Sequence, residues 1–154
     1  MAQTRRQLLT TAQAALVTPL AAIGSVAYIA RREPSQTSED SIVVLDIGSE
    51  DDEIREQYNG GCAPVLTRST TLVASCEVRS TSTPPTEDDA DARLTSLVEV
   101  VRGVLLGPAT GWAIDHARIA SRAEYRVGAS EADIPTALCI LAVELQTDGV
   151  QYEA

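Results

Sequence analysis

The sequence predicts an α+β fold in which two helices pack on one mixed or antiparallel sheet of about five strands. Apolar residues recur at helical spacing in two segments, alternate with polar residues in two others, and form uninterrupted runs elsewhere. The expected order is helix, strand, strand, strand, helix, strand, strand. With 154 residues, 44% of them hydrophobic, residues 1–154 are expected to form a single domain around one core.

The first helix is expected from Thr4 to Val17, because apolar residues return there every three or four positions. Pro19 and Gly24 are expected to end it. A short strand from Ser25 to Arg31 should follow.

The same N-terminal segment admits two other interpretations. Residues 7–30 carry no charge, and a membrane anchor needs about 20 such residues. Arg5 and Arg6 precede this stretch in the manner of a twin-arginine export signal. The polar residues within the stretch and the absence of a well-spaced cleavage site favour the packed helix and strand.

The next part of the chain predicts two strands separated by a long acidic loop. Ile42 to Ile47 is β-branched and uninterrupted, as in a buried strand. Thr70 to Val78 alternates apolar and polar residues, as in a half-buried strand. Between them, a segment rich in acids and glycine predicts a loop over 48–66. A Ser/Thr/Pro-rich stretch predicts a second loop over 80–86.

The second helix has clear signals at both ends. Thr86 and Asp89 form a Thr-x-x-Asp pattern in which the Thr hydroxyl can accept from the backbone N–H of Asp89. Acids in the first turn favour the positive end of the helix dipole. Gly107 and Pro108 should end the helix. Its apolar face is expected to contain Leu94, Leu97, Val98, Val101, Val104 and Leu105.

Two strands are expected near the C-terminus. Ile119 to Val127 alternates apolar and charged residues, and a turn over 128–133 follows. Thr136 to Leu145 is apolar on both faces. This pattern is typical of a central strand, or of a strand whose outer face meets another subunit.

The charge balance excludes some functions. The chain has 22 acids, 12 basic residues and a net charge of −10, which argues against binding nucleic acid through phosphate contacts. Every basic residue is Arg. Acid-rich, Lys-poor proteins are typical of salt-loving archaea, because molar salt shortens the Debye length to about 3 Å and screens the self-repulsion. GC-rich codon usage is the alternative explanation.

Catalytic and metal-binding patterns are weak. His116 is the only His and lies beside Asp115, but no Gly-x-Ser-x-Gly elbow accompanies them. The acids over 50–56 do not follow the EF-hand pattern. The cysteines lack zinc-site spacing and suit small buried apolar positions at 76 and 139. We therefore expect no catalytic residue, metal or cofactor, and keep a small enzyme that uses Asp115 and His116 as an alternative.

The order of elements, the length and the acidity resemble the tail terminator proteins of long-tailed phages and haloarchaeal tailed viruses, over about residues 4 to 150. The segments that carry the resemblance are Thr4 to Val17, Ser25 to Arg31, Pro34, Glu39 to Leu45, Ala74 to Arg79, Asp91 to Leu106, the strands up to Leu145, and Tyr152.

The resemblance implies a structural virion protein without an active site. Such proteins form a hexameric ring on the tail tube, end its polymerisation and join the tail to the neck or head–tail connector. The expected partners are further copies of the chain, the tail tube protein and the connector, with no membrane. DNA would pass through the lumen without specific binding, and the protein would be made in the host cytoplasm.

Residues of two kinds are the interface candidates for such a ring. An acidic segment suits a ring face or lumen along which DNA must slide, and an apolar outer strand face suits a closed ring contact. The alternatives are another neck or head–tail completion protein of the same fold, and an exported haloarchaeal surface or binding domain. The candidate residues are Glu50, Asp51, Asp52, Glu53, Glu56, Leu138 and Ile140.

Overall fold

The computed structural model confirms the predicted class and order of elements. It describes residues 5–29, 40–56, 65–107, 116–129 and 134–151. Side chains are described in these ranges apart from 52–56, 65–66, 116–129 and 147–151. The elements are α1 (Arg5–Ala21), β1 (Val26–Ile29), β2 (Ser41–Glu56), β3 (Val65–Arg79), α2 (Glu87–Leu105), β4 (His116–Ala129) and β5 (Pro135–Gln151).

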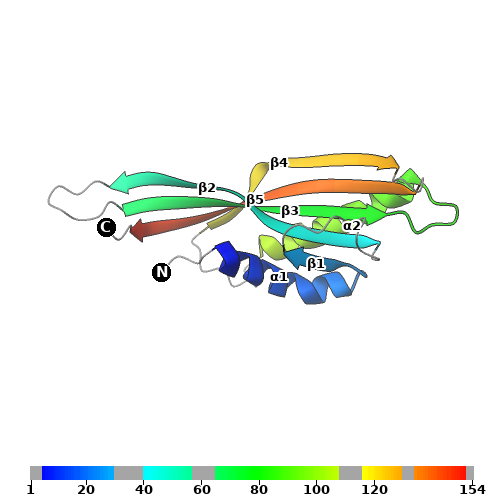
Figure 1. Ribbon diagram of the computed structural model, residues 1–154, viewed down its shortest axis with the longest axis horizontal. Helices are drawn as coiled ribbons and strands as arrows, with labels where there is room; N and C mark the ends of the chain where they lie inside the picture. Colours follow the sequence, from blue (N-terminus) through cyan, green and yellow to red (C-terminus); the bar gives the residue numbers. More distant parts are fainter. Residues whose placement is uncertain (1–4, 30–39, 57–64, 108–115, 130–133, 152–154) are drawn as a thin grey trace.

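The strands of the described ranges form one five-stranded sheet in the order β1-β2-β3-β5-β4 (Figure 1). β1 lies parallel to β2, and all other neighbours are antiparallel. β5 therefore occupies an interior position between β3 and β4, as the apolar run Thr136 to Leu145 predicted. β1 and β4 are the outermost strands.

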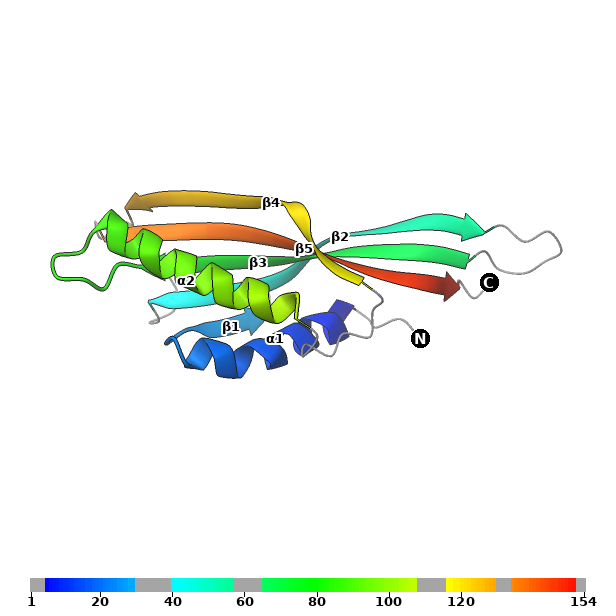
Figure 2. The same ribbon diagram turned by 180° about the vertical axis from the view of Figure 1, so that it is seen from behind.

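Both helices pack on the same face of this sheet (Figure 2). Their apolar sides and the inward residues of β2, β3 and β5 form a single buried cluster. Strand alternation determines which residues enter it, because successive side chains point to opposite faces. On β5 every second residue is buried, namely Ala137, Cys139, Leu141, Val143 and Leu145.

Helix α1 is longer than the sequence predicted. It continues through Pro19 to Ala21, because proline so near the end of a helix removes only one late hydrogen bond while Leu16 and Leu20 are fully buried. The prediction that Pro19 ends the helix is wrong. Gly24 does terminate this segment, at φ 73°.

The hydrogen bonds after α1 explain the role of Gly24. The N–H of Ser25 donates to the carbonyl of Leu20 at 2.8 Å, and the N–H of Gly24 donates to that of Ala21 at 3.2 Å. This pair of bonds is the Schellman pattern, which requires a left-handed residue at the position of Gly24. The buried hydroxyls of Ser25 and Ser41, 3.0 Å apart, then join this turn to the start of β2.

The predicted loop over 48–66 is wrong for most of its length. Residues 48–56 belong to β2 and residues 65–66 to β3, while 57–64 lie outside the described residues. The two strands pair from Ser41 opposite Val78 to Glu56 opposite Val65. Local composition suggested a loop, but tertiary pairing with β3 overrides the low strand propensity of acids.

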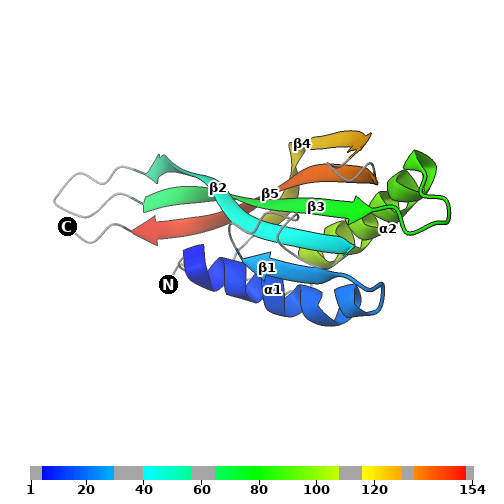
Figure 3. The same ribbon diagram turned by 45° about the vertical axis from the view of Figure 1, so that its right-hand side comes forward.

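Beyond the helices, β2, β3 and β5 continue together as a three-stranded extension (Figure 3). The register of β2 shifts by one residue between Ile47 and Ser49, which is a bulge at Gly48. A Cβ atom at Gly48 would lie 2.9 Å from a methyl group of Val73. Glycine therefore permits β3 to approach closely where the extension begins.

Residues 80–86 form a loop between β3 and α2, as predicted. The Thr86 hydroxyl accepts from the N–H of Asp89 at 3.1 Å, which confirms the expected N-cap. The Asp89 carboxylate in turn accepts from the Ser80 hydroxyl and from the N–H groups of Thr81 and Ser82. These bonds lower the pKa of Asp89 and connect the loop to the helix.

The first helix is part of the core, which favours the packed-helix interpretation of the N-terminus. Five of its residues are buried, namely Leu8, Leu9, Ala12, Leu16 and Leu20. The side-chain amide of Gln13 also donates to the Ala27 carbonyl at 3.0 Å. Among the helices of the described ranges, none has both the length and the apolar character needed to cross a membrane.

This packing predicts the effect of two neighbouring substitutions. Leu16→Ala should lower the free energy of unfolding by about 2–5 kcal/mol, the usual cost of truncating a buried Leu, because Leu16 is 0% exposed. Val17→Ala is the matched control, since Val17 is 56% exposed, and should change it by less than about 0.5 kcal/mol. Urea unfolding at fixed protein and salt concentration measures both, and equal effects would contradict the packing of α1.

Candidate assembly surface

The face of the sheet opposite the helices is the first candidate site. The strand register places Val26, Ile42, Glu77 and Leu138 in one row across four strands. The next row contains Tyr28, Val44, Ser75 and Ile140, and a third contains Asp46, Val73 and Ala142. These rows alternate with the core residues, so they lie on the outer face.

This outer face is apolar at its centre. Val26 is 39% exposed, and Tyr28, Val44, Val73, Leu138, Ile140 and Ala142 are partly exposed. No helix of the described residues covers it, because both helices pack into the cluster on the other side. Contiguous apolar surface of this kind is typical of an interaction site. The structure places Leu138 and Ile140, two of the predicted interface residues, in the middle of this face.

Glu77 lies between Ile42 and Leu138 in the first of these rows and carries an acidic side chain. Burial raises the pKa of its carboxyl above the ordinary value of 4.5, and the charge of Arg79 partly opposes this effect. Glu77 is half-buried, so neighbouring groups already exclude part of the water from its carboxyl in a single copy. A partner that covered this face would increase the effect.

The second candidate site is the acidic edge of the extension. β1 pairs with β2 only from Ile42 to Leu45, so residues 46–56 of β2 have no described strand on that side. This edge carries six acids and one Arg. Glu50 lies at the position opposite Thr70 and forms an ion pair with Arg68, whose Nε is 3.4 Å from Oε1 of Glu50. Asp51 is exposed.

The structure does not bring the predicted interface residues together in one patch. Leu138 and Ile140 lie opposite Glu77 and Ser75, whereas Glu50 lies opposite Thr70 beyond the bulge at Gly48. Asp52, Glu53 and Glu56 follow along β2, opposite Arg68, Thr67 and Val65. The candidates therefore form two separate surfaces, one apolar on the sheet and one acidic on its edge.

The remaining candidate chemistry is sparse among the described residues. His116 begins β4, and Asp115 lies outside the described residues. A groove of about 220 Å³ beside α2 is lined by Ile23, Ser41, Ala92, Arg93, Ser96 and Leu97. Its one charged group, Arg93, donates to the carbonyl of Arg79. No group of three or more His, Cys, Asp or Glu side chains in the described ranges is placed to hold a metal ion.

Cys76 and Cys139 lie directly opposite each other on the core side of β3 and β5. Both are thiols rather than members of a disulfide, and both are fully buried, which confirms their prediction as small apolar residues. Burial, and to a smaller extent the neighbouring Cys139, raises the pKa of Cys76 to about 12. A thiol with this pKa is protonated at neutral pH and is a poor nucleophile.

Sequence comparison identifies no relative, since no protein-family model and no curated protein matches the chain. A comparison of folds does find a similar structure. The chain is similar to one from the virion of a native gene transfer agent (GTA) particle, with a TM-score of 0.50 and 15% sequence identity. The match covers 92% of this chain and 95% of the other. The two chains therefore share a fold over nearly their whole lengths.

The position of Glu77 predicts how stability depends on pH. Its folded pKa is raised, so ionising it costs stability above that pKa, and the cost disappears as the pH falls towards 4.5. Glu77→Gln should therefore be more stabilising, relative to the unsubstituted chain, at pH 7 than at pH 4.5. Urea unfolding at both pH values measures this, with Glu99→Gln on the exposed side of α2 as the control. An equal difference at both pH values would contradict the argument.

Proposed function

We propose that this protein is a structural subunit of a tailed virion. The observation that carries the proposal is the likeness over 92% of this chain and 95% of a chain from a gene transfer agent virion. The coverage of both chains supports comparison of whole subunits rather than of a shared local motif. The apolar sheet face opposite the helices gives such a subunit a surface for assembly.

The specific role that we propose is tail termination. Copies of the chain form a hexameric ring on the last ring of the tail tube, stop its polymerisation and present a surface to the neck or head–tail connector. A contact between two different surfaces of the same subunit closes into a ring when the rotation between copies allows it. Another neck or completion protein of the same fold is the alternative within this class.

The charge distribution suits a ring through which DNA passes. A chain with a net charge of −10 repels the phosphate backbone, so DNA moves through the lumen without specific binding. The proposed host is a salt-loving archaeon, in whose cytoplasm the subunit is made before it joins the virion. In this role the protein has no catalytic activity and needs no cofactor.

The alternative of an exported surface domain requires removal or membrane retention of the N-terminal segment. Cleavage after residue 30 would remove α1 and β1, and with them five buried helix residues from the core. This cost supports the virion proposal. The N-terminal residue of the protein purified from its native cells distinguishes the two, because an exported form would begin near residue 31.

The ring predicts a defined mass in solution. Light scattering in molar KCl should give about 98 kDa, which is six chains of 16.3 kDa each, independent of dilution over a range of micromolar concentrations. A monomer at every concentration would contradict a preformed hexamer.

The location of the protein is tested separately. Gold-labelled antibody against this chain, applied to particles induced from the cells that carry the sequence, should mark the junction of head and tail. Labelling along the capsid, at the tail tip or on the cell surface would contradict tail termination, whatever the mass in solution.

A further inference from the structure

The two edges of the sheet carry opposite charge. On one edge, residues 46–56 of β2 contain six acids and one Arg. On the other edge, β4 contains three Arg and one Glu, namely Arg118, Arg122, Arg126 and Glu124. A net positive strand is notable in a chain whose net charge is −10. The sheet therefore has an acidic edge and a basic edge, separated by the width of the sheet.

Among the described residues, both edges also present backbone without a strand partner. β4 pairs with β5 alone, over His116 to Ala129, and residues 46–56 of β2 pair with β3 alone in the described part of the chain. Exposed edges of this length are prone to pair with another chain unless they are covered. Charge protects an edge from contact with a like-charged edge, but it favours contact with an edge of opposite sign.

We propose that neighbouring copies of this chain meet edge to edge, with β4 of one copy against the acidic β2 edge of the next. This inference rests on the proposed ring and names its subunit contact. The contact joins two different surfaces, so each copy uses one edge on either side, and the series of contacts closes into a ring when the rotation between copies divides a full turn. It leaves the helices and the apolar outer face available to other components of the virion.

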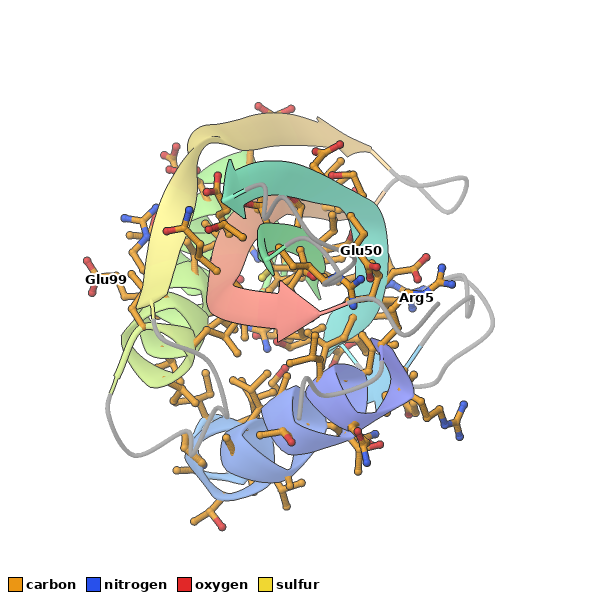
Figure 4. All side chains as sticks on the ribbon, turned by 90° about the vertical axis from the view of Figure 1, so that its left-hand side faces the viewer. Arg5, Glu50 and Glu99 are labelled. Carbon is orange, nitrogen blue, oxygen red and sulfur yellow. The ribbon has the colours of Figure 1, made fainter. Side chains whose placement is uncertain are left out.

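The placement of the acids on α2 supports the choice of the β2 edge as the acidic surface of this contact. Glu99 lies on α2, on the opposite side of the molecule from Glu50 in an end view (Figure 4). Asp88, Asp91 and Glu99 are exposed on that helix. By contrast, β4 and residues 46–56 of β2, which lie past the end of the pairing with β1, are on opposite sides of the β3–β5 pair in a single sheet, as a contact that repeats from copy to copy requires.

Charge reversal tests the contact directly. The basic-edge variant carries Arg118→Glu, Arg122→Glu and Arg126→Glu. The acidic-edge variant carries Asp51→Arg, Asp52→Arg and Glu53→Arg, and leaves Glu50 in its ion pair with Arg68. Each variant alone brings like charges together at every contact, so its mass by light scattering should fall from the hexamer to the monomer, about a sixfold loss.

A mixture of the two variants provides the decisive measurement. When they alternate around a ring of even number, every contact again joins opposite charges, so an equimolar mixture should recover the hexamer mass. A chain with all six reversals should assemble alone for the same reason, and it keeps the test informative if one single-edge variant does not fold. The control is Asp91→Arg with Glu99→Arg on α2, which should leave the mass unchanged.

Each outcome has a definite meaning. Hexamers formed by either single-edge variant alone would overturn the edge contact while leaving the ring intact. Monomers in both the mixture and the six-reversal chain, with the fold preserved by circular dichroism, would also overturn it. A monomeric unsubstituted chain would remove the preformed ring itself, and the edge contact with it.

Discussion

The antiparallel pairing of β3 with β5 is the interaction on which the rest of the structure depends. It runs from Arg79 opposite Thr136 to Val65 opposite Gln151. On one side of these strands, alternate residues enter the core beneath both helices; on the other side, they form the apolar outer face. Where the pair continues past the helices, it supports the acidic portion of β2. The core, the outer face and the extension are therefore three consequences of one register.

Sequence patterns were sufficient where the determinants are local. The N-cap at Thr86, the apolar face of α2 and the alternation along β3 follow from contacts within a few residues. They failed where distant segments decide the conformation. Pro19 remains helical because Leu16 and Leu20 are buried against the sheet. The acidic residues 50–56 become a strand because β3 provides their partner, which no local propensity could indicate.

The candidate surfaces were predictable to a similar extent. The apolar outer residues of β5 form a run without alternation, so the sequence alone indicates Leu138 and Ile140 as interface candidates. Their neighbours Val26, Tyr28 and Val44 were not, because only the parallel pairing of β1 with β2 brings them onto the same face. The opposite charge of the two edges also required the strand order, since β2 and β4 are far apart in sequence.

Hydrogen–deuterium exchange of the assembled and dissociated protein tests the central claim most directly, which is that the sheet and its edges, not the helices, make the contacts of assembly. The account predicts that amides of β4 and of residues 46–56 become slower to exchange on assembly, because their unpaired N–H groups are covered. Amides of α1 and α2 should change little. Protection confined to the helices, with both edges unchanged, would contradict the account.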